Sequence, residues 1–475
     1  MEFNRSNYAK NNQGRNQPLK KKMIMVRGIL LFLFIGLMLI TGCSGSTKPE
    51  RNGEKASPKA EKINWLVSSN AEQLKGYQKL LKKFSNDTGI PSNVMGVEYG
   101  QMYPKLQSLI AAKKTPEINN WGTELVPWAA RGAMTPLDDY ITKDNFDMEQ
   151  FHENMVQSLQ WQDKQWEIPY SMGTCVLYYN KDLFEKAGVE PPPHDWSDPS
   201  WDMKAFLEMA QKLTIDKSGR DALDPKFDPD HVQQYGLGNM QSWWFYPWYF
   251  GGDWTDQDVT KYTGNDPKVI EAMQFMADLA NKYHVMPSTE QSQALAAGGN
   301  IFMTGRVAMT VDGTWSCSTL KDARFKWDMA ATPHDKQHSI VLFTDGFGVG
   351  GKSENPDGGW EFIKWLYSDK DHYLELLNAA NSYMAIPALK SAEEDVKNVL
   401  IKRFPDVDIN VMFEAAKQPD ARPVYMRYHA NWNAINDLIN QEAVTPIMSG
   451  ETTAKKALPG ITDKVQSLID EASKK

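Results

Sequence analysis

A dense aromatic segment is the part of this sequence best suited to binding an organic ligand. Residues 243–250 read WWFYPWYF, seven aromatics in eight positions, and Gly-Gly-Asp-Trp follows at 251–254. In either a strand or a helix, some of these rings must face outward. Such rings stack on the apolar C–H faces of a sugar, while carboxylates and amides bond its hydroxyls. Trp243, Trp244 and Trp248 are therefore candidate ligand contacts, with core packing as an equal alternative.

Other tryptophans extend this set of candidates. The chain has 16 Trp, 18 Tyr and 19 Phe, and four of the Trp lie in or near expected loops: Trp65, Trp121, Trp315 and Trp432. For each of them the same two interpretations, a ligand-stacking surface or a core side chain, stay open.

A second motif matches the pattern that binds nucleotide phosphates. Residues 346–353 read GFGVGGKS, which fits GxxxxGK[ST], and a predicted strand precedes it. However, Pro356 favours a helix that begins after Lys352, capped by Ser353 or Asn355. A phosphate loop instead places its Lys and Ser in the first helical turn. We therefore interpret the segment as a Gly-rich crossing between two lobes and expect no cofactor.

Signatures of catalysis and of metal binding are weak. The sequence contains no HExxH, GxSxG or CxxC motif, and its 60 Asp and Glu residues always offer chance pairs. Asp216, Asp221 and Asp224 crowd one loop and are weak calcium candidates, but their spacing differs from a regular calcium loop. A solvated acidic loop is the alternative. Cys175 and Cys317 are interpreted as small buried apolar residues, although a disulfide between them stays open.

The N-terminal segment indicates export. A basic flank with Lys20 to Lys22 and Arg27 precedes the uncharged run GILLFLFIGLMLI at residues 28–40, which is short for a membrane span. The following Ile-Thr-Gly-Cys resembles the lipobox of bacterial lipoproteins, which implies a signal peptide at 1–42 and a lipid on Cys43. An uncleaved anchor is the alternative. Without residues 1–42 the net charge falls from -8 to about -14, which argues against nucleic acid as a partner.

Alternating strands and helices are predicted after a flexible tether at 43–62. We expect strands at 63–67 and 338–343, and helices at 74–84, 103–112 and 360–367, with Gly89 ending the first helix. This alternation predicts an α/β protein with parallel sheets, whose ligands bind beyond the carboxyl ends of the strands.

One run of residues carries a family resemblance. Residues 173–188 read GTCVLYYNKDLFEKAG, with three Pro at 191–193 and Trp196 after them. This run resembles the signature of family 1 of extracellular solute-binding proteins, the sugar-binding components of ABC importers. Further segments agree in order, namely 115–117, 132–137, 167–170, 305–315 and 346–366, so the resemblance covers residues 63–470. Asn119 and Asn120 depart from it, since the family has apolar residues there.

The resemblance implies a two-lobed, type II binding-protein fold with a ligand cleft and a hinge. The chain would cross between lobes near 170–174 and 344–348. The expected N-terminal lobe is 63–170 plus 345–395, and the expected C-terminal lobe is 171–344 plus 396–475. Ligand binding would close the lobes.

The resemblance also implies a function. A monomeric, lipid-anchored protein on the outer face of the cytoplasmic membrane would bind a sugar and deliver it to a permease, and the aromatic run favours an oligosaccharide. The sugar would stack on Trp315, Trp432 and the aromatics before Gly251. Its hydroxyl groups would donate hydrogen bonds to Asp253, Asp312 or Asp345, and Tyr170 would lie at the hinge. Arg422 and Arg427 leave room for an acidic sugar. An exported carbohydrate-active enzyme, a lectin-like module, and a binder of another solute on this fold stay as alternatives.

Overall fold

A computed structural model describes residues 61–472, apart from 241, 297–298, 381–384 and 425–428. All of these residues belong to one contact unit, 58–475. Cys43 and the expected signal peptide lie outside the described residues. Within the described part of the chain, no helix combines the length and apolar character needed to cross a membrane.

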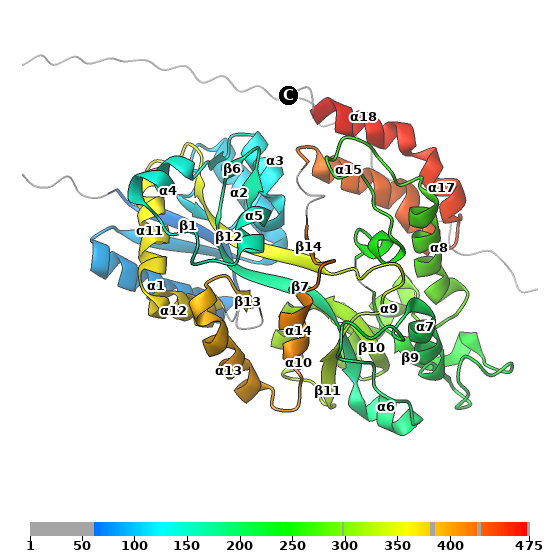
Figure 1. Cartoon of the computed structure of the whole chain (residues 1–475). Helices are drawn as coiled ribbons and strands as arrows, with labels where there is room; N and C mark the ends of the chain where they lie inside the picture. Colours follow the sequence, from blue (N-terminus) through cyan, green and yellow to red (C-terminus); the bar gives the residue numbers. More distant parts are fainter. Residues whose placement is uncertain (1–60, 241, 297–298, 381–384, 425–428, 473–475) are drawn as a thin grey trace, which may run out of the picture. The chain divides into compact units, whose positions relative to one another are not determined.

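One continuous mixed sheet organises the chain (Figure 1). Its strand order is β2-β1-β3-β12-β7-β10-β9-β8, and β4, β11, β13 and β14 pair at its sides. The strands are β1 Ile63–Ser68, β2 Ser92–Val97, β3 Ile118–Asn119, β4 Met134–Thr135, β7 Ile168–Asn180, β8 Ile215–Asp216, β9 Val232–Leu237, β10 Val307–Gly313, β11 Trp327–Ala330, β12 Val341–Gly350, β13 Ile386–Pro387 and β14 Arg422–Pro423. A separate hairpin pairs β5 Gln160–Trp161 with β6 Lys164–Gln165.

Helices cover this sheet. They are α1 Ala71–Thr88, α2 Tyr99–Ala111, α3 Leu125–Ala130, α4 Asp138–Asp144, α5 Glu153–Ser158, α6 Lys181–Ala187, α7 Met203–Lys212, α8 Pro267–Asn281, α9 Thr289–Ala296, α10 Cys317–Leu320, α11 Pro356–Ser368, α12 Lys370–Ala380, α13 Glu393–Arg403, α14 Asn410–Ala415, α15 Trp432–Ile439, α16 Thr445–Met448, α17 Ala454–Gly460 and α18 Thr462–Ala472. The α1 helix packs on α12 and β2, and α11 packs on α12 and β12 (Figure 1).

The first helix illustrates how local sequence sets its ends. The Asn70 side chain accepts hydrogen bonds from the backbone amides of Glu72 and Gln73. The Gln73 side chain in turn accepts a hydrogen bond from the backbone amide of Asn70, which completes a capping box. Gly89 ends the helix in the left-handed conformation, with φ 76°. The predicted apolar periodicity is confirmed, since Tyr77 and Phe84 face the core.

The two longest strands of the sheet, β7 and β12, pair in its middle. They run antiparallel from Leu342 opposite Thr174 to Phe347 opposite Ile168, and the register shifts between Asp345 and Gly346. The rest of β7 pairs with β10 and β11, while the rest of β12 pairs with β3 and β4. These two strands therefore join both halves of the sheet. The strand expected at 338–343 is corrected, since it begins at Val341 and continues to Gly350.

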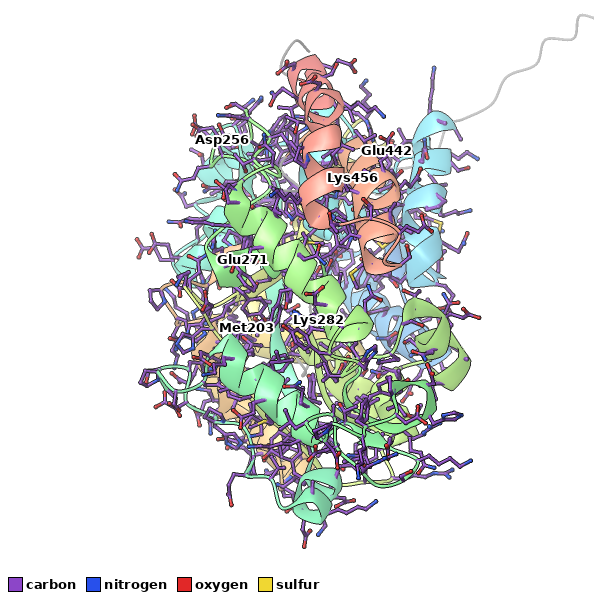
Figure 2. The ribbon with its side chains drawn as sticks, turned by 90° about the vertical axis from the view of Figure 1, so that its right-hand side faces the viewer. Met203, Asp256, Glu271, Lys282, Glu442 and Lys456 are labelled. Atoms are coloured by element: carbon purple, nitrogen blue, oxygen red, sulfur yellow. The ribbon has the colours of Figure 1, made fainter. Side chains whose placement is uncertain are left out.

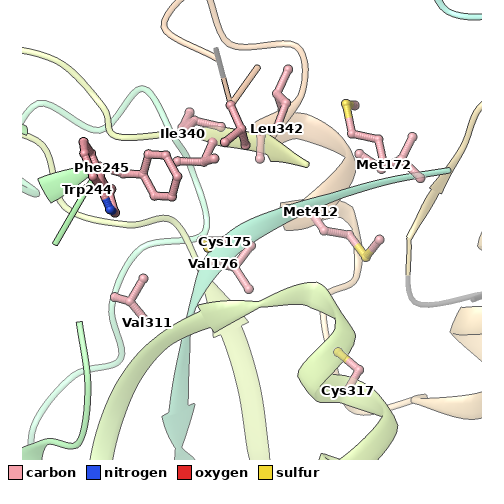
Figure 3. Packing of buried hydrophobic residues seen from close by; sticks show 14 of the residues in the cluster. Met172, Cys175, Val176, Trp244, Phe245, Val311, Cys317, Ile340, Leu342 and Met412 are labelled. Atoms are coloured by element: carbon pink, nitrogen blue, oxygen red, sulfur yellow. The ribbon is translucent and has the colours of Figure 1, made fainter. Parts of the chain in front are cut away.

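Buried apolar side chains surround β7 (Figure 3). Every residue of β7 except Tyr170 is buried, as expected for a strand covered on both faces. Figure 3 shows Met172 and Val176 of β7 in one apolar cluster with Leu342 of β12 and Val311 of β10. Cys175 and Cys317 are both buried and do not form a disulfide, which confirms their interpretation as small core residues.

The Gly-rich motif has a structural role. Gly346, Gly348 and Gly350 lie within β12, and α11 begins at Pro356 with an Asn355 cap, as predicted. A Cβ atom at Gly350 would lie 2.1 Å from the Pro116 carbonyl oxygen. The glycines thus allow close approach of neighbouring backbone.

Polar residues at 119–120 shorten a strand without removing it. Asn119 pairs with Gly348 as the last residue of β3, and its side-chain amide donates to the Pro116 carbonyl at 3.0 Å. The expected strand is therefore present, but it spans only Ile118–Asn119.

Replacing Gly350 with alanine tests this structural role of the motif. We expect Gly350→Ala to lower the free energy of unfolding by about 1–3 kcal/mol or more, because backbone rather than a flexible side chain must move. Urea unfolding measures the change. Gly100→Ala is the matched control, since a Cβ there meets nothing within 4 Å. Equal stability of the two variants would contradict the close-approach explanation.

Candidate functional site

The aromatic segment at 243–250 folds differently from the prediction. It forms neither a strand nor an α-helix but a turn followed by the 3-10 helix Tyr246–Phe250, which Gly251 ends at φ 72°. The expectation that some rings face outward is met only in part, by Trp243, because this tight turn lets the other rings pack into the hydrophobic core. Within the segment only Trp243 is half-buried, and the other aromatics are buried.

Three indole rings form a stack beside this turn. The ring centroids of Trp243 and Trp244 are 4.2 Å apart at 28°, and those of Trp244 and Trp432 are 4.2 Å apart at 41°. The Trp244 Nε1–H donates to Asn436 Oδ1 at 2.6 Å, which orients the middle ring. Residues 243 and 432, far apart in sequence, thus build one aromatic surface whose accessible end is Trp243.

An ion pair adjoins the same turn. The Arg422 guanidinium lies 4.3 Å from the centroid of the Trp248 ring and 3.4 Å from Asp253 Oδ2. Burial raises the pKa of Asp253 to about 6, although bonds from Trp248, the Trp254 amide and the charge of Arg422 oppose this shift. Trp248 has no exposed surface, so its predicted role in stacking on a ligand does not fit this conformation. Arg427 lies outside the described residues.

Trp315 is the exposed aromatic of the predicted site. Its side chain is 49% exposed, and its ring meets Phe343 edge-on at 5.3 Å and 82°. The ring lies over two glycines, since Cβ atoms at Gly173 and Gly313 would be 3.2 Å and 2.1 Å from it. A bulky flat ring therefore occupies the space of two absent side chains, with one face supported by backbone.

Asp312 lies directly before this ring. Its Oδ1 accepts the Gly313 amide at 2.7 Å, and its Oδ2 accepts the Ser316 hydroxyl at 2.6 Å. Burial raises the pKa of Asp312, and these two hydrogen bonds oppose the shift. The carboxylate thus braces the turn that carries Trp315 and keeps remaining lone pairs for a ligand.

Asp345 lies two residues after Phe343 on β12, so the two side chains share a face of the strand. The carboxyl group is half-buried, and its Oδ1 lies 3.2 Å from where a Cβ of Gly122 would be. Burial raises the pKa of Asp345 to about 7. Within the described residues, no side chain or amide donates a hydrogen bond to this carboxylate.

Glu167 is a second buried carboxyl group at the strand crossing, and sequence reasoning missed it. It has no exposed surface, and its Oε1 accepts the Trp121 amide at 2.8 Å. Burial raises its pKa to about 8, the charge of Asp345 adds to the shift, and the amides of Trp121 and Gly122 oppose it. A Glu directly before the apolar strand Ile168–Asn180 was the available signal.

A small pocket adjoins these acids. It has a cavity volume of only about 10 Å³, which is room for about one water molecule, and is lined by Gly122, Ser158, Leu159, Leu342, Thr344, Pro423 and Val424. The Thr344 hydroxyl is buried and has no hydrogen-bond partner among the described residues. Segments from both halves of the sheet therefore converge here around a buried polar group.

Two other candidates from the sequence lie in the core. Trp121 and Trp65 are 0% and 1% exposed, and Trp121 packs against Trp128 with centroids 5.8 Å apart. Neither ring can contact a ligand in this conformation. Tyr170 is half-buried and stacks on Phe347 at 5.0 Å, so it supports the crossing strand next to Asp345 rather than the aromatic surface.

The acidic loop does not assemble a calcium site within the described residues. The buried Asp216 carboxylate binds Arg220 at 2.9 Å and also accepts the amides of Ser218 and Asp228. Asp221 and Asp224 accept amides of their own turns. These carboxylates organise the loop. Arg220 pairs with Asp216, which the calcium interpretation had assigned as a metal ligand.

A groove on the outer surface contains none of the predicted ligand residues. It lies along α8 beside Lys455 and is lined by Pro267, Ile270, Glu271, Gln274, Phe275, Asp278 and Lys455. Figure 2 shows Glu271 and Lys282 along α8, with Lys456 on the neighbouring α17. The predicted ligand residues lie instead on and beside β12, as Asp345 does, and in the stack of indole rings.

Comparison with known proteins assigns the chain to a family. Residues 68–373 match the family described as bacterial extracellular solute-binding protein. The chain belongs to this family. The resemblance stated from the sequence is thereby confirmed, and the arrangement around β12 belongs to a solute-binding protein.

Relatives and solved structures agree with this assignment. The sn-glycerol-3-phosphate-binding periplasmic protein of Rhizobium meliloti is 23% identical over 428 residues, covering 86% of this chain and 94% of that protein. The maltotriose-binding protein of Pyrococcus abyssi is 23% identical over 283 residues, covering 56% and 54%. An ABC substrate-binding protein of Listeria monocytogenes, solved with cycloalternan, matches with a TM-score of 0.72 and 24% identity over 86% of this chain and 99% of that one. This binding protein therefore has the predicted two-lobed α/β fold.

Glu167 predicts a pH dependence of stability. Its pKa of about 8 lies above the ordinary 4.5, so the folded state holds the proton more tightly than the unfolded state. Its contribution is present below about pH 4.5 and is lost as the pH rises through 8, at up to about 1.4 kcal/mol per unit. Glu167→Gln should remove this slope. Chemical unfolding of both proteins from pH 5 to 8 measures it, and parallel curves would contradict the shift.

Proposed function

We propose that this protein is the carbohydrate-binding component of an ABC importer and catalyses no reaction. The observation that carries the proposal is Trp315, the tryptophan that the described residues leave about half exposed, at 49%. A flat apolar surface beside carboxylates and a buried hydroxyl suits a ligand with C–H faces and many hydroxyl groups. Carbohydrates have this combination.

The relatives support a sugar as the ligand. A maltotriose-binding protein and a structure in complex with cycloalternan are among the similar proteins. The sn-glycerol-3-phosphate-binding relatives cover more of the chain but name a different class of ligand. We favour a sugar because the accessible groups described above are aromatic rings and hydrogen-bond acceptors.

Binding would proceed by enclosure. In the proposed open form, Trp315 and Trp243 offer ring faces to the sugar, and Asp312 and Asp345 accept its hydroxyls. Closure would bring the lobes 63–170 plus 345–395 and 171–344 plus 396–475 together and exclude water, which strengthens these hydrogen bonds. We propose bending within β7 and β12 as the hinge, because those strands join both halves of the sheet.

The proposed partners are membrane permease subunits, reached by a tethered monomer. Cys43 would carry the lipid, and residues 44–62 are rich in Gly, Ser, Pro and Lys, as flexible tethers are. The anchor would hold the binding protein on the outer face of the membrane, close to the permease.

A ligand screen tests the proposed function. We expect one or more of maltotriose, mannotriose and cyclic glucans to raise the melting temperature of the protein that lacks residues 1–43, since a ligand at 100 times its Kd stabilises by ~2.7 kcal/mol. Chromatography of the recovered sugar should find it intact. Cleaved sugar would establish an enzyme instead, and stabilisation by peptides alone would establish another solute.

Truncating the exposed indole tests the site. Trp315→Ala should weaken binding of the best sugar at least about tenfold, or about 1.4 kcal/mol, because it removes the stacking surface. Titration calorimetry measures the change. The control is Ile401→Ala on α13, a side chain with a similar exposure of 51%, which should leave affinity unchanged. Unchanged affinity in Trp315→Ala would refute the site.

The anchor has its own test. In a bacterial host with lipoprotein processing, the full chain should incorporate labelled palmitate and partition into detergent, and Cys43→Ala should do neither. A Cys43→Ala protein that still takes up label would contradict the assignment. Cys175→Ala is the control, because that thiol is buried and should not affect labelling.

A further inference from the structure

Asp345 is a carboxylate of the candidate site to which no described residue donates a hydrogen bond. A carboxylate can accept about four hydrogen bonds, yet no described residue donates one to it. By contrast, Asp312 receives the Gly313 amide and the Ser316 hydroxyl, and Glu167 receives the Trp121 amide. A half-buried carboxylate on a central strand with no described donor is free to accept hydrogen bonds from a ligand.

The described titratable groups that interact with Asp345 are carboxyl and phenol groups. Glu167 lies close enough for the two carboxyl groups to interact electrostatically. Asp312 precedes the Trp315 ring, which packs on Phe343 of the same strand face as Asp345. The described cation of the candidate site, Arg422, already contacts both Asp253 and the Trp248 ring. The described part of the candidate site therefore offers hydrogen-bond acceptors, and its arginine is already paired.

We propose that Asp345 is a specificity-determining residue, which accepts hydrogen bonds from hydroxyl groups of a neutral carbohydrate and excludes ligands that carry a phosphate or carboxylate. This inference rests on the proposed function and deepens it. It sets this binding protein apart from its sn-glycerol-3-phosphate-binding relatives in ligand class. It also counts against the acidic sugar for which Arg422 left room, since Arg422 is paired with Asp253.

The exclusion follows from two costs. An anion placed against Asp345 would meet the like charge of its ionised form in a partly desolvated site, where such repulsion is weakly screened. The oxygens of such an anion accept hydrogen bonds but donate none, so they could not satisfy the carboxylate of Asp345, which also only accepts. A neutral hydroxyl avoids both costs.

The proposal predicts a proton linked to binding. The described titratable groups that face Asp345 are Tyr77 from α1, Glu167 directly before β7, and Tyr170 from β7. With a pKa of about 7, Asp345 is about half protonated at pH 7 before the ligand arrives. Hydroxyls that donate to its carboxylate favour the ionised form. Binding at pH 7 should therefore release up to about half a proton.

The experiment compares neutral and anionic probes on the wild-type protein and on Asp345→Asn. The neutral probes are maltotriose and mannotriose, and the anionic probes are sn-glycerol 3-phosphate and trigalacturonate. In the wild type, only neutral probes should raise the melting temperature. Calorimetry at pH 7 in two buffers of different ionisation enthalpy should find proton release for the tighter neutral probe.

The variant separates a ligand role from a structural one. Asp345→Asn should lose at least about tenfold in affinity for that probe and lose its proton release. Without ligand, its melting temperature at pH 8 should equal or exceed that of the wild type, because it removes a poorly solvated charge. Asp221→Asn, which removes one charge from the acidic loop, should keep wild-type affinity and proton release.

Two kinds of failure can be told apart. If no neutral probe binds the wild type, the proposed function falls and this inference with it. If a neutral probe binds, three results would overturn the inference alone. They are equal binding of an anionic probe, proton uptake on binding, and unchanged affinity in Asp345→Asn.

Discussion

The antiparallel pairing of β7 with β12 is the interaction on which the remaining structure depends. Each strand spends half its length on this pairing and half on neighbours in one part of the sheet. The hydrogen bonds that pair the two strands join backbone groups, so the side chains of Phe343 and Asp345 remain for other contacts. The part of the candidate site that Phe343 and Asp345 form thus lies on a strand that joins both halves of the sheet.

Around this crossing, the chain combines aromatic packing with incompletely satisfied acids. The indoles of Trp243, Trp244 and Trp432 support one another, and only their outer end reaches the surface. The carboxyl groups of Glu167 and Asp345 are held in poorly solvated positions that favour their neutral forms. Carboxyl groups in such poorly solvated surroundings reduce the stability of the protein without ligand. Functional sites commonly keep groups of this kind because they contribute to ligand binding.

Local elements of the fold follow from the sequence, while contacts between distant segments do not. Apolar periodicity predicts α1, Pro356 and Asn355 predict the start of α11, and the motif order predicts the family. The aromatic run at 243–250 misled, because periodicity cannot distinguish an exposed ring from one buried under a 3-10 turn. The packing of Trp315 over Gly173 brings together residues more than a hundred positions apart, and local sequence patterns do not predict contacts over such a separation.

That packing has an evolutionary consequence. The indole of Trp315 owes its position to the two glycines beneath it, Gly173 and Gly313, rather than to side chains that grip it. A methyl group added at either position would tilt or lift the ring while leaving its chemistry intact. A relative that has the same tryptophan could therefore acquire a new ligand preference through substitutions at the positions of Gly173 and Gly313. The presence of the tryptophan alone would then be a poor guide to the ligand.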